Sequence, residues 1–324
     1  MADLRAPAGI GVVGGVSTKH RDEWRLFLAS LWRYRYLYAM LVLPFAYFAV
    51  FRFYPILGNV MAFKDYKLAL GIWGSPWVGF KHFEALFGDE IFMRSLWNTL
   101  SIACLKLAFA FPAPIVLALF INEIRSLTYK RFLQTVVYAP NFLSWVIYAA
   151  ILYVVLSPAN GIVNNILASL GFEKIPFFQV PALFQPLVVI SSILKESGWA
   201  AVIYLAAISS IDPQLYEAAH IDGANRWQLM RHVTLPGLSP TIMTLLILQF
   251  GWFLNVGFEQ LFIMQNNVVL STGDIIETFI YRVGIQRARF DFTTAAGLFN
   301  SAVGMILILA ADRIAKRMGL QGIL

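Results

Sequence analysis

Six apolar runs, each close to the length of a membrane-spanning helix, constrain the fold of this chain more than any other feature. A helix needs about 20 apolar residues to cross the hydrocarbon core of a bilayer. Lipid offers no partner to unpaired backbone groups, and the runs lack the alternation that is typical of barrel strands, so helices are predicted. The expected spans are 37–57, 96–121, 132–156, 184–208, 236–264 and 294–311.

The composition agrees with this interpretation. Hydrophobic residues make up 59% of the 324 residues and charged residues only 13%, whereas soluble domains carry about 25% charged residues. The sequence therefore predicts an all-α polytopic membrane protein with a transmembrane domain over residues 36–324. Residues 1–35 are expected to form a flexible cytoplasmic tail and not a cleaved signal, because their first half is glycine-rich and charged residues follow.

Lysine and arginine are distributed unevenly between the two sides of the predicted membrane domain. Six spans place both termini on one side, and the termini together with the loops after the second and fourth spans carry the excess of basic residues. Such loops stay in the cytoplasm. We therefore expect an inner-membrane protein with both termini cytoplasmic. This distribution explains most of the net charge of +7, so no nucleic-acid partner is required.

The sequence contains no pattern typical of a metal site or of a nucleotide site. The four histidines are scattered, without a second ligand at a metal-binding spacing. Residues 14–19 faintly resemble a phosphate-binding loop but lack the glycine before Lys19. We therefore expect neither a metal nor ATP hydrolysis by this chain.

The insert between the fourth and fifth spans is polar and has the signals of two short helices. Asp212, followed by a proline, is placed to cap the first helix. Gly223 allows a bend before a second helix, expected over 224–232, which Leu235 and Pro236 should end before the fifth span. Two helices joined at a glycine form an elbow that suits docking into a groove of another protein. An amphipathic interfacial loop is the alternative.

The letters of this elbow resemble the EAA loop of permease subunits in bacterial ABC importers. Val233 and Met230 replace the family's usual isoleucine and aromatic residue, and both keep an apolar contact. Segments 255–260, 278–284 and 295–300 are similar to the carbohydrate branch, the permeases for oligosaccharides and polysaccharide fragments, and most of all to the first permease subunit of an alginate importer. The matching residues of the loop are Glu217, Ala218, Ala219, Asp222, Gly223, Leu235 and Pro236.

This resemblance implies the type I importer permease fold and a transporter of several chains. A second permease would complete the pathway, and two ATPase subunits, which bind ATP and Mg²⁺, would hold the coupling loop 212–236 of each permease. A periplasmic sugar-binding protein would deliver an oligosaccharide, with acidic, alginate-like cargo as the specific expectation. Closure of the ATPase dimer would pull the elbows together and rock the spans, with Glu217 at the ATPase cleft and Gly223 as the bend.

Polar and aromatic residues interrupt the fourth and fifth spans, where maltose-type relatives contact sugar. Intramembrane charge is costly and normally faces the interior of a bundle, and Lys195 in this position is suited to pair with a uronate carboxylate. The alternative for each residue is packing within the protein, pairing with another chain or contact with lipid. The predicted substrate pathway consists of Lys195, Trp199, Gln249, Trp252, Phe253 and Asn255.

Two longer segments outside the spans, about 58–94 and 265–292, are expected to form the docking surface for the binding protein. Trp73, Trp77 and Phe80 in the first segment fit that role, and they fit the role of membrane-interface anchors equally well.

Two other classes of protein remain as alternatives. An ion-coupled secondary carrier for sugars would also have polar spans, but it has no use for the elbow and usually shows an internal repeat. A membrane enzyme would need clustered acids or a metal near the membrane face, and only Asp212, Glu217 and Asp222 are candidates. The helical spacing of the last two suits docking better than catalysis.

Overall fold

The computed structural model describes residue 30 and residues 32–317, and it falls into two units, residues 1–59 and residues 60–324. The tail predicted for residues 1–35 therefore lies almost entirely outside the described residues. In the first unit, one long helix is built from three consecutive elements. These are α2 (Arg35–Phe48), the π-helical η1 (Ala49–Phe53) and α3 (Tyr54–Ile56).

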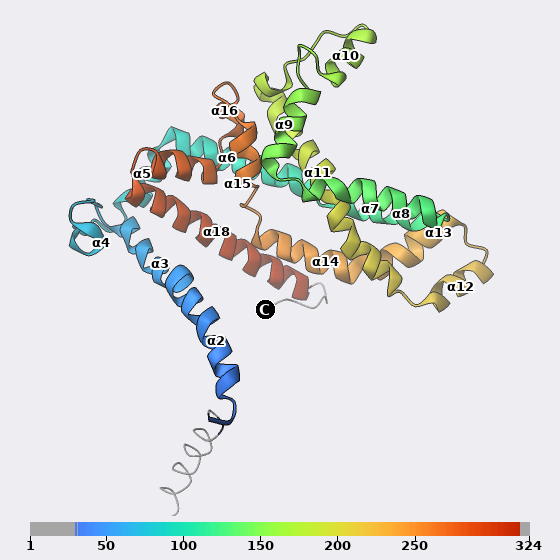
Figure 1. The fold of residues 1–324 in the computed structure, drawn as a ribbon, viewed down its shortest axis with the longest axis horizontal. Helices are drawn as coiled ribbons and strands as arrows, with labels where there is room; N and C mark the ends of the chain where they lie inside the picture. The colour runs from blue at the N-terminus through green and yellow to red at the C-terminus, as the bar shows by residue number, and fades with distance from the viewer. Residues whose placement is uncertain (1–29, 31, 318–324) are drawn as a thin grey trace, which may run out of the picture. The chain divides into compact units, whose positions relative to one another are not determined.

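The second unit is also helical (Figure 1). Before the elbow its helices are α4 (Gly71–Gly74), α5 (Lys81–Gly88), α6 (Glu90–Leu105), η3 (Lys106–Ala110), α7 (Pro112–Glu123), α8 (Leu127–Tyr138), η4 (Ala139–Phe142), α9 (Trp145–Val155), α10 (Ile162–Ser169), η5 (Phe177–Gln179) and α11 (Pro181–Ser209). From the elbow onward they are α12 (Pro213–Ile221), α13 (Arg226–Leu229), η6 (Met230–Thr234), α14 (Leu235–Gly251), α15 (Phe258–Met264), α16 (Leu270–Gly273), α17 (Ile276–Phe279), η7 (Ile280–Ile285) and α18 (Phe290–Arg317). The short 3-10 helix η2 (Leu57–Phe63) crosses from the first unit into the second.

The helices that can cross a membrane confirm the predicted fold class. Among the described residues, a pair of helices bent by 107°, Leu127–Phe142 and Trp145–Val155, completes six spans when it is counted as one. The part of the chain that the structure describes contains no strand, only an isolated bridge between Lys64 and Trp77. The five single spans are Arg35–Phe63, Glu90–Asn122, Pro181–Ser209, Arg226–Gly251 and Phe290–Ile314.

Three π-helical turns allow these helices to continue past prolines. In each turn the N–H of the residue just before the proline donates to the carbonyl five residues earlier. Proline lacks an N–H, and its ring clashes with the carbonyl four residues back in a regular helix. The wider π turn accommodates the ring, so the helix does not end. The pairs are η1 with Pro55, η3 with Pro112 and η6 with Pro236.

Helix α11 is the centre of the second unit. It packs against α6, α7, α8, α14 and α16, and 50% of its most apolar window is buried, against 17–22% for the other single spans of this unit. Its buried face carries small residues, which allow neighbouring backbones to approach closely. These residues are Ser191, Ser192, Ser197, Gly198 and Ala201.

Two of the expected spans differ from the observed helices. The span expected over 132–156 is not a single helix: Pro140 lies in η4, and Ser144 starts α9 by accepting a hydrogen bond from the Ile147 N–H at 3.3 Å. The span expected over 236–264 begins ten residues earlier than predicted and ends at Gly251. The break in the first span and the early end of the second arise where local capping or a turn competes successfully with helical continuity. The early start of the second follows from the π turn η6, which carries the helix past Pro236.

A buried ion pair fixes the segment after α15 to α6. The carboxylate of Asp274 is fully buried and accepts hydrogen bonds from both terminal nitrogens of Arg282. It also accepts from Ser95 Oγ at 3.0 Å and from Thr278 Oγ1 at 2.9 Å. The Asn98 amide donates to the Asp274 carbonyl at 3.0 Å. The carboxylate is therefore saturated by donors from α6, α17 and η7.

We expect Asp274→Ala to destabilise the protein by about 3 kcal/mol, because it leaves the Arg282 guanidinium without its buried counter-ion. The measurement is the thermal unfolding of the purified protein in detergent. Glu84→Ala, at an exposed position of α5, is the control and should leave the unfolding temperature unchanged. An unchanged unfolding temperature for Asp274→Ala would show that the ion pair does not fix this segment.

Candidate functional site

The predicted elbow begins with a capped helix. Helix α12 starts directly after Asp212, whose Oδ1 accepts a hydrogen bond from the Gln214 N–H at 2.9 Å. Pro213 occupies the first helical position, where its missing N–H has no helical partner to lose. The helix start predicted from the sequence is confirmed.

The bend after α12 depends on Gly223, which has a φ of +81°. Its N–H donates to the His220 carbonyl at 3.0 Å, and the Ala224 N–H donates to the Ala219 carbonyl at 2.9 Å. This pair of hydrogen bonds is the Schellman motif, which ends a helix at a left-handed residue. Glycine adopts that conformation without steric cost, so the predicted bend is present for the predicted reason.

The second arm of the elbow is much longer than predicted. Asn225 caps it with a reciprocal pair of hydrogen bonds to Gln228, at 2.7 and 3.0 Å. The helix then runs without a break over Arg226–Gly251. The expectation that Leu235 and Pro236 end a short helix is therefore wrong, because the π turn η6 carries the helix past the proline. The second arm of the elbow and the fifth span are one continuous helix.

Contacts between the two arms hold the elbow at a fixed angle. The Tyr216 hydroxyl lies 3.0 Å from Thr234 Oγ1, and Thr234 is buried. A Cβ at Gly237 would stand 2.7 Å from Cδ1 of Ile211, so this glycine lets the chain before α12 approach α14. These contacts connect α12 to the base of α14.

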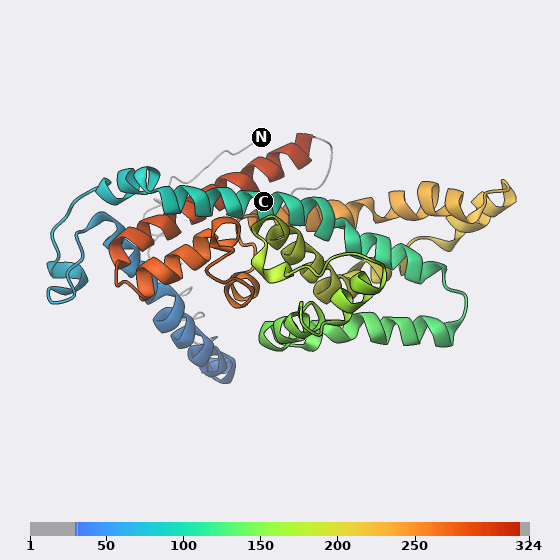
Figure 2. The ribbon, with the colours of Figure 1, turned by 90° about the horizontal axis from the view of Figure 1, so that it is seen from above.

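The elbow lies at one end of the second unit in both views (Figures 1 and 2). Glu217 and Asp222 are exposed, and they lie beside apolar side chains that are also exposed. In the chain without its partners, the predicted coupling residues thus form part of a surface that is both charged and apolar. Its apolar members were not among the predicted coupling residues; they are Leu215, Ile221 and Trp227, which are 55%, 87% and 64% exposed.

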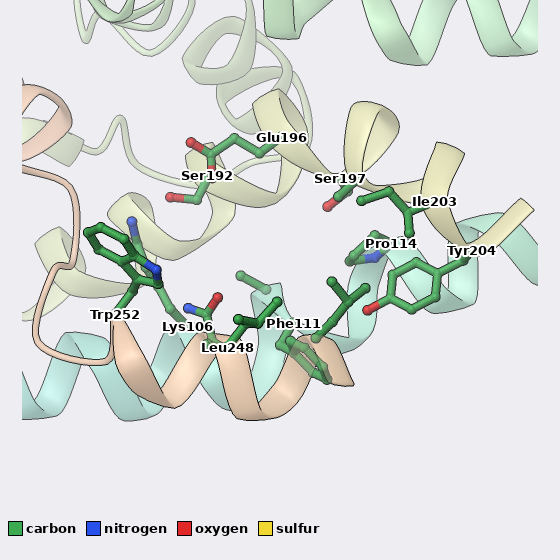
Figure 3. Close-up of a pocket in the computed structure, with 14 residues that line it drawn as sticks. Lys106, Phe111, Pro114, Ser192, Glu196, Ser197, Ile203, Tyr204, Leu248 and Trp252 are labelled. Carbon is green, nitrogen blue, oxygen red and sulfur yellow. The ribbon is translucent and has the colours of Figure 1, made fainter. Parts of the chain in front are cut away.

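A cavity of about 310 Å³ lies between three spans of the second unit. Its walls come from η3 and α7, from α11, and from α14 together with the residue that follows it, Trp252. The close-up in Figure 3 shows a polar end and an apolar end. Lys106, Ser192 and Glu196 gather beside the Trp252 ring at the first end, and Pro114, Ile203 and Tyr204 lie at the second.

The structure brings only some of the predicted pathway residues together. Gln249 and Trp252 line this cavity. Asn255 lines a second cavity that shares Trp252, and Phe253 packs against a buried apolar cluster. Trp199 is half exposed and meets an aromatic ring of η4 edge-on, with 5.5 Å between the centroids. The end of the fifth span therefore borders two different cavities, and the fourth span lines only the first of them.

Lys195 belongs to α11, its side chain reaches the bend between η4 and α9, and it does not line the cavity. Its side chain is buried, its Nζ donates to the Asn141 carbonyl at 3.2 Å, and the Nζ stands 5.2 Å from the centroid of Trp145. A cation is favourable near the carbonyl end of a helix and over an indole face. Lys195 thus stabilises the bend within this chain.

Lys106 is the basic residue in the cavity wall, and the sequence analysis did not place it in the pathway. Its Nζ donates to the Val256 carbonyl and to Gln260 Oε1, both at 2.7 Å. Gln260 in turn accepts from Ser192 Oγ at 3.0 Å and donates to the Val188 carbonyl at 2.7 Å. The sequence did contain a signal for this residue, because a lysine inside an apolar run normally faces the interior of a helix bundle.

Two carboxylates lie near this lysine without forming an ion pair with it. Glu196 lines the cavity, and no described basic side chain is paired with it. Burial raises the pKa of the Glu277 carboxyl, while a hydrogen bond from the Phe258 backbone and the charge of Lys106 oppose the rise. Because an ammonium group has three donors and two are used, the polar end of the cavity retains capacity for a ligand.

Comparison with known proteins gives the family of the chain. Residues 110–319 match the family described as the binding-protein-dependent transport system inner membrane component. Protein LplB of Bacillus subtilis (strain 168) is 44% identical over 92% of this chain and 93% of its own length. The polygalacturonan/rhamnogalacturonan transport system permease protein YteP of the same organism is 43% identical over 99% of both chains.

Solved structures agree with the sequence relatives. A chain of a bacterial ABC transporter involved in the import of the acidic polysaccharide alginate superposes with a TM-score of 0.84. It is 43% identical and covers 90% of this chain and 99% of its own. This chain belongs to the family of inner-membrane permease components of binding-protein-dependent ABC transporters. The predicted resemblance and fold are confirmed, and nothing supports the ion-coupled carrier.

We expect Gly198→Ala to prevent close packing of α11 on α8, because the added Cβ would overlap the carbonyl oxygen of Val137. Overpacking of this kind costs about 2 kcal/mol, and the yield and unfolding temperature of the purified protein should both fall. Gly88→Ala is the matched control, since a Cβ there meets nothing within 4 Å. Equal behaviour of the two variants would contradict the close approach of α11 and α8.

Proposed function

We propose that the chain is one permease of an importer whose cargo is oligosaccharides that carry carboxylates. Two similar proteins support an acidic cargo. One belongs to an importer of the acidic polysaccharide alginate, and the other is a permease for polygalacturonan, a polymer of a uronic acid, and rhamnogalacturonan. The similarity to each covers nine-tenths or more of this chain.

The proposed transporter contains a second permease, two ATPase subunits that bind ATP and Mg²⁺, and a periplasmic sugar-binding protein. The chain itself contributes no nucleotide site and no enzyme activity. A structure of the alginate transporter in complex with a pentasaccharide-bound periplasmic protein supports the delivery partner. The distribution of basic residues supports cytoplasmic termini and a cytoplasmic elbow. Segments 58–94 and 265–292 then face the binding protein.

The observation that carries the acidic cargo is the polar end of the 310 Å³ cavity. The Lys106 amine can pair with a uronate carboxylate through its remaining donor, and the Trp252 indole can stack on a sugar ring. Gln249 and Ser192 supply neutral groups that bind hydroxyls. The Glu196 carboxylate repels an anion at the same end of the cavity and can accept a hydrogen bond from a sugar hydroxyl. The preference for acidic cargo therefore depends on the balance between Lys106 and Glu196.

The elbow is proposed to transmit the closure of the ATPase dimer to this cavity. Glu217, Ala218, Ala219 and Asp222 lie on α12 or at its end and would contact the ATPase subunit. The Schellman motif at Gly223 and the contact between Tyr216 and Thr234 keep α12 fixed on the helix that continues into α14. Leu235 and Pro236 belong to that continuous helix and not to a separate joint.

We expect Gly223→Pro to lower binding-protein-stimulated ATPase activity about tenfold. Proline cannot adopt a positive φ and removes the N–H that bonds to the His220 carbonyl, so the elbow changes its angle. Gly223→Asn is the matched control, because asparagine tolerates the left-handed region. The measurement is ATP hydrolysis by the reconstituted transporter with loaded binding protein. Activity of the proline variant equal to that of the asparagine variant would rule out the fixed bend.

We expect Lys106→Met to lower the ratio of acidic to neutral oligosaccharide uptake about tenfold. The reason is that the variant loses one charge-assisted hydrogen bond to the acidic cargo, which corresponds to about a tenfold change in affinity. Glu196→Gln should raise the same ratio, because it removes the opposing carboxylate. Uptake into proteoliposomes is measured for both cargoes with each variant. Lys106→Arg keeps the charge and is the control for the hydrogen bonds that Lys106 makes within the protein.

A general loss of uptake without a change in this ratio would assign Lys106 a structural role only. It would leave the acidic cargo without its recognition group.

A further inference from the structure

The first cavity is small for the cargo proposed above. Its 310 Å³ lies at the lower end of the range for ligand pockets, about 300–1,000 Å³. A fragment of several sugar units must therefore extend beyond it. The cargo can extend past Trp252, because this residue is 65% exposed and lines a second cavity as well as the first.

The second cavity, of about 380 Å³, lies between the end of α14 and α18. Its polar lining is neutral, with Asn255 from the break after α14 and Asn300 and Ser301 from α18. Near Gly251 and Gly304 the two helices come together: a Cβ on Gly304 would lie 3.8 Å from the Gly251 carbonyl oxygen. The close approach of α14 and α18 at these two glycines forms one wall of the cavity.

The polar groups of the second cavity have unused hydrogen-bonding capacity. Oδ1 of Asn300 is buried and has no hydrogen-bond partner among the described residues. The backbone N–H of Asn255 donates to the Trp252 carbonyl, but its exposed side-chain amide is bonded to no described residue. The Ser301 hydroxyl donates to the Gly297 carbonyl at 2.9 Å, which leaves its lone pairs free. A buried amide oxygen without a partner is costly in an apolar environment. These groups are therefore suited to a hydroxylated ligand.

We propose that the second cavity is a further sugar subsite, which binds the unit next to the one held beside Lys106 and reads its hydroxyl groups through Asn300, Asn255 and Ser301. This inference rests on the proposed function, since it requires an oligosaccharide cargo. The Trp252 indole is the platform between the two subsites. The cargo bends around Trp252, with its charged unit on the Lys106 side and neutral hydroxyl contacts on the α18 side.

The test compares Asn300→Leu with the parent in the full transporter, using a disaccharide and a tetrasaccharide in acidic and neutral forms. Loss of one neutral hydrogen bond corresponds to about fivefold. Tetrasaccharide uptake should fall by that factor, while disaccharide uptake and the ratio of acidic to neutral cargo stay unchanged. Ile306→Leu, at a neighbouring exposed position of α18 that does not line this cavity, is the matched control and should leave all uptake unchanged.

Parent-like tetrasaccharide uptake by Asn300→Leu would overturn the subsite. If this variant instead fails to assemble with the second permease, Ser301→Ala replaces it, and parent-like tetrasaccharide uptake by Ser301→Ala then overturns the subsite in favour of an interface between permeases. Failure of the proposed function has a different result, because the parent transporter would then take up neither form of oligosaccharide, or would not distinguish acidic from neutral cargo.

Discussion

A carbonyl group freed by a break in a membrane helix needs a donor inside the protein, because lipid supplies none. At two breaks in the second unit a lysine provides that donor: Lys106 bonds to the Val256 carbonyl after α14, and Lys195 bonds to the Asn141 carbonyl at the bend before α9. Helix α11 carries Lys195 and reaches the other break through Ser192 and Gln260. The central helix thus holds both breaks in place, and the cavity walls keep their shape because of these hydrogen bonds.

The continuous helix from the elbow to the cavity is the route by which the proposed docking of an ATPase subunit would reach the cavity. Arg226–Gly251 contains 26 residues and at 1.5 Å per residue is about 39 Å long. Its third turn is fixed to α12 through Thr234, and its last turn carries Gln249 and ends beside Trp252. Such a helix fits the proposed role of a rigid lever, because a displacement of the elbow would move one wall of the cavity against α11 without a flexible joint between them.

The sequence predicted those parts of the structure that depend on local patterns. Apolar runs predicted the spans, and Asp212, Pro213 and Gly223 predicted the start and the bend of the elbow, because caps and left-handed positions follow from residue type. The continuation past Pro236 was not predictable, since proline normally ends a helix and a π turn leaves no clear mark in the letters. The predicted pathway included Lys195 and left out Lys106. Each is a lone basic residue in an apolar run, and only the packing of α11 shows which one lines the cavity.

The central claim is that nucleotide binding by partner subunits opens this cavity to one side of the membrane at a time. The most direct measurement uses Gln249→Cys in a Cys104→Ser background, so that the reconstituted transporter has one reactive cysteine in this chain. Membrane-impermeant thiol reagents are then applied from either side. We predict labelling from the cytoplasmic side without nucleotide and from the periplasmic side in the ATP-bound state. Labelling that does not depend on nucleotide would contradict the account.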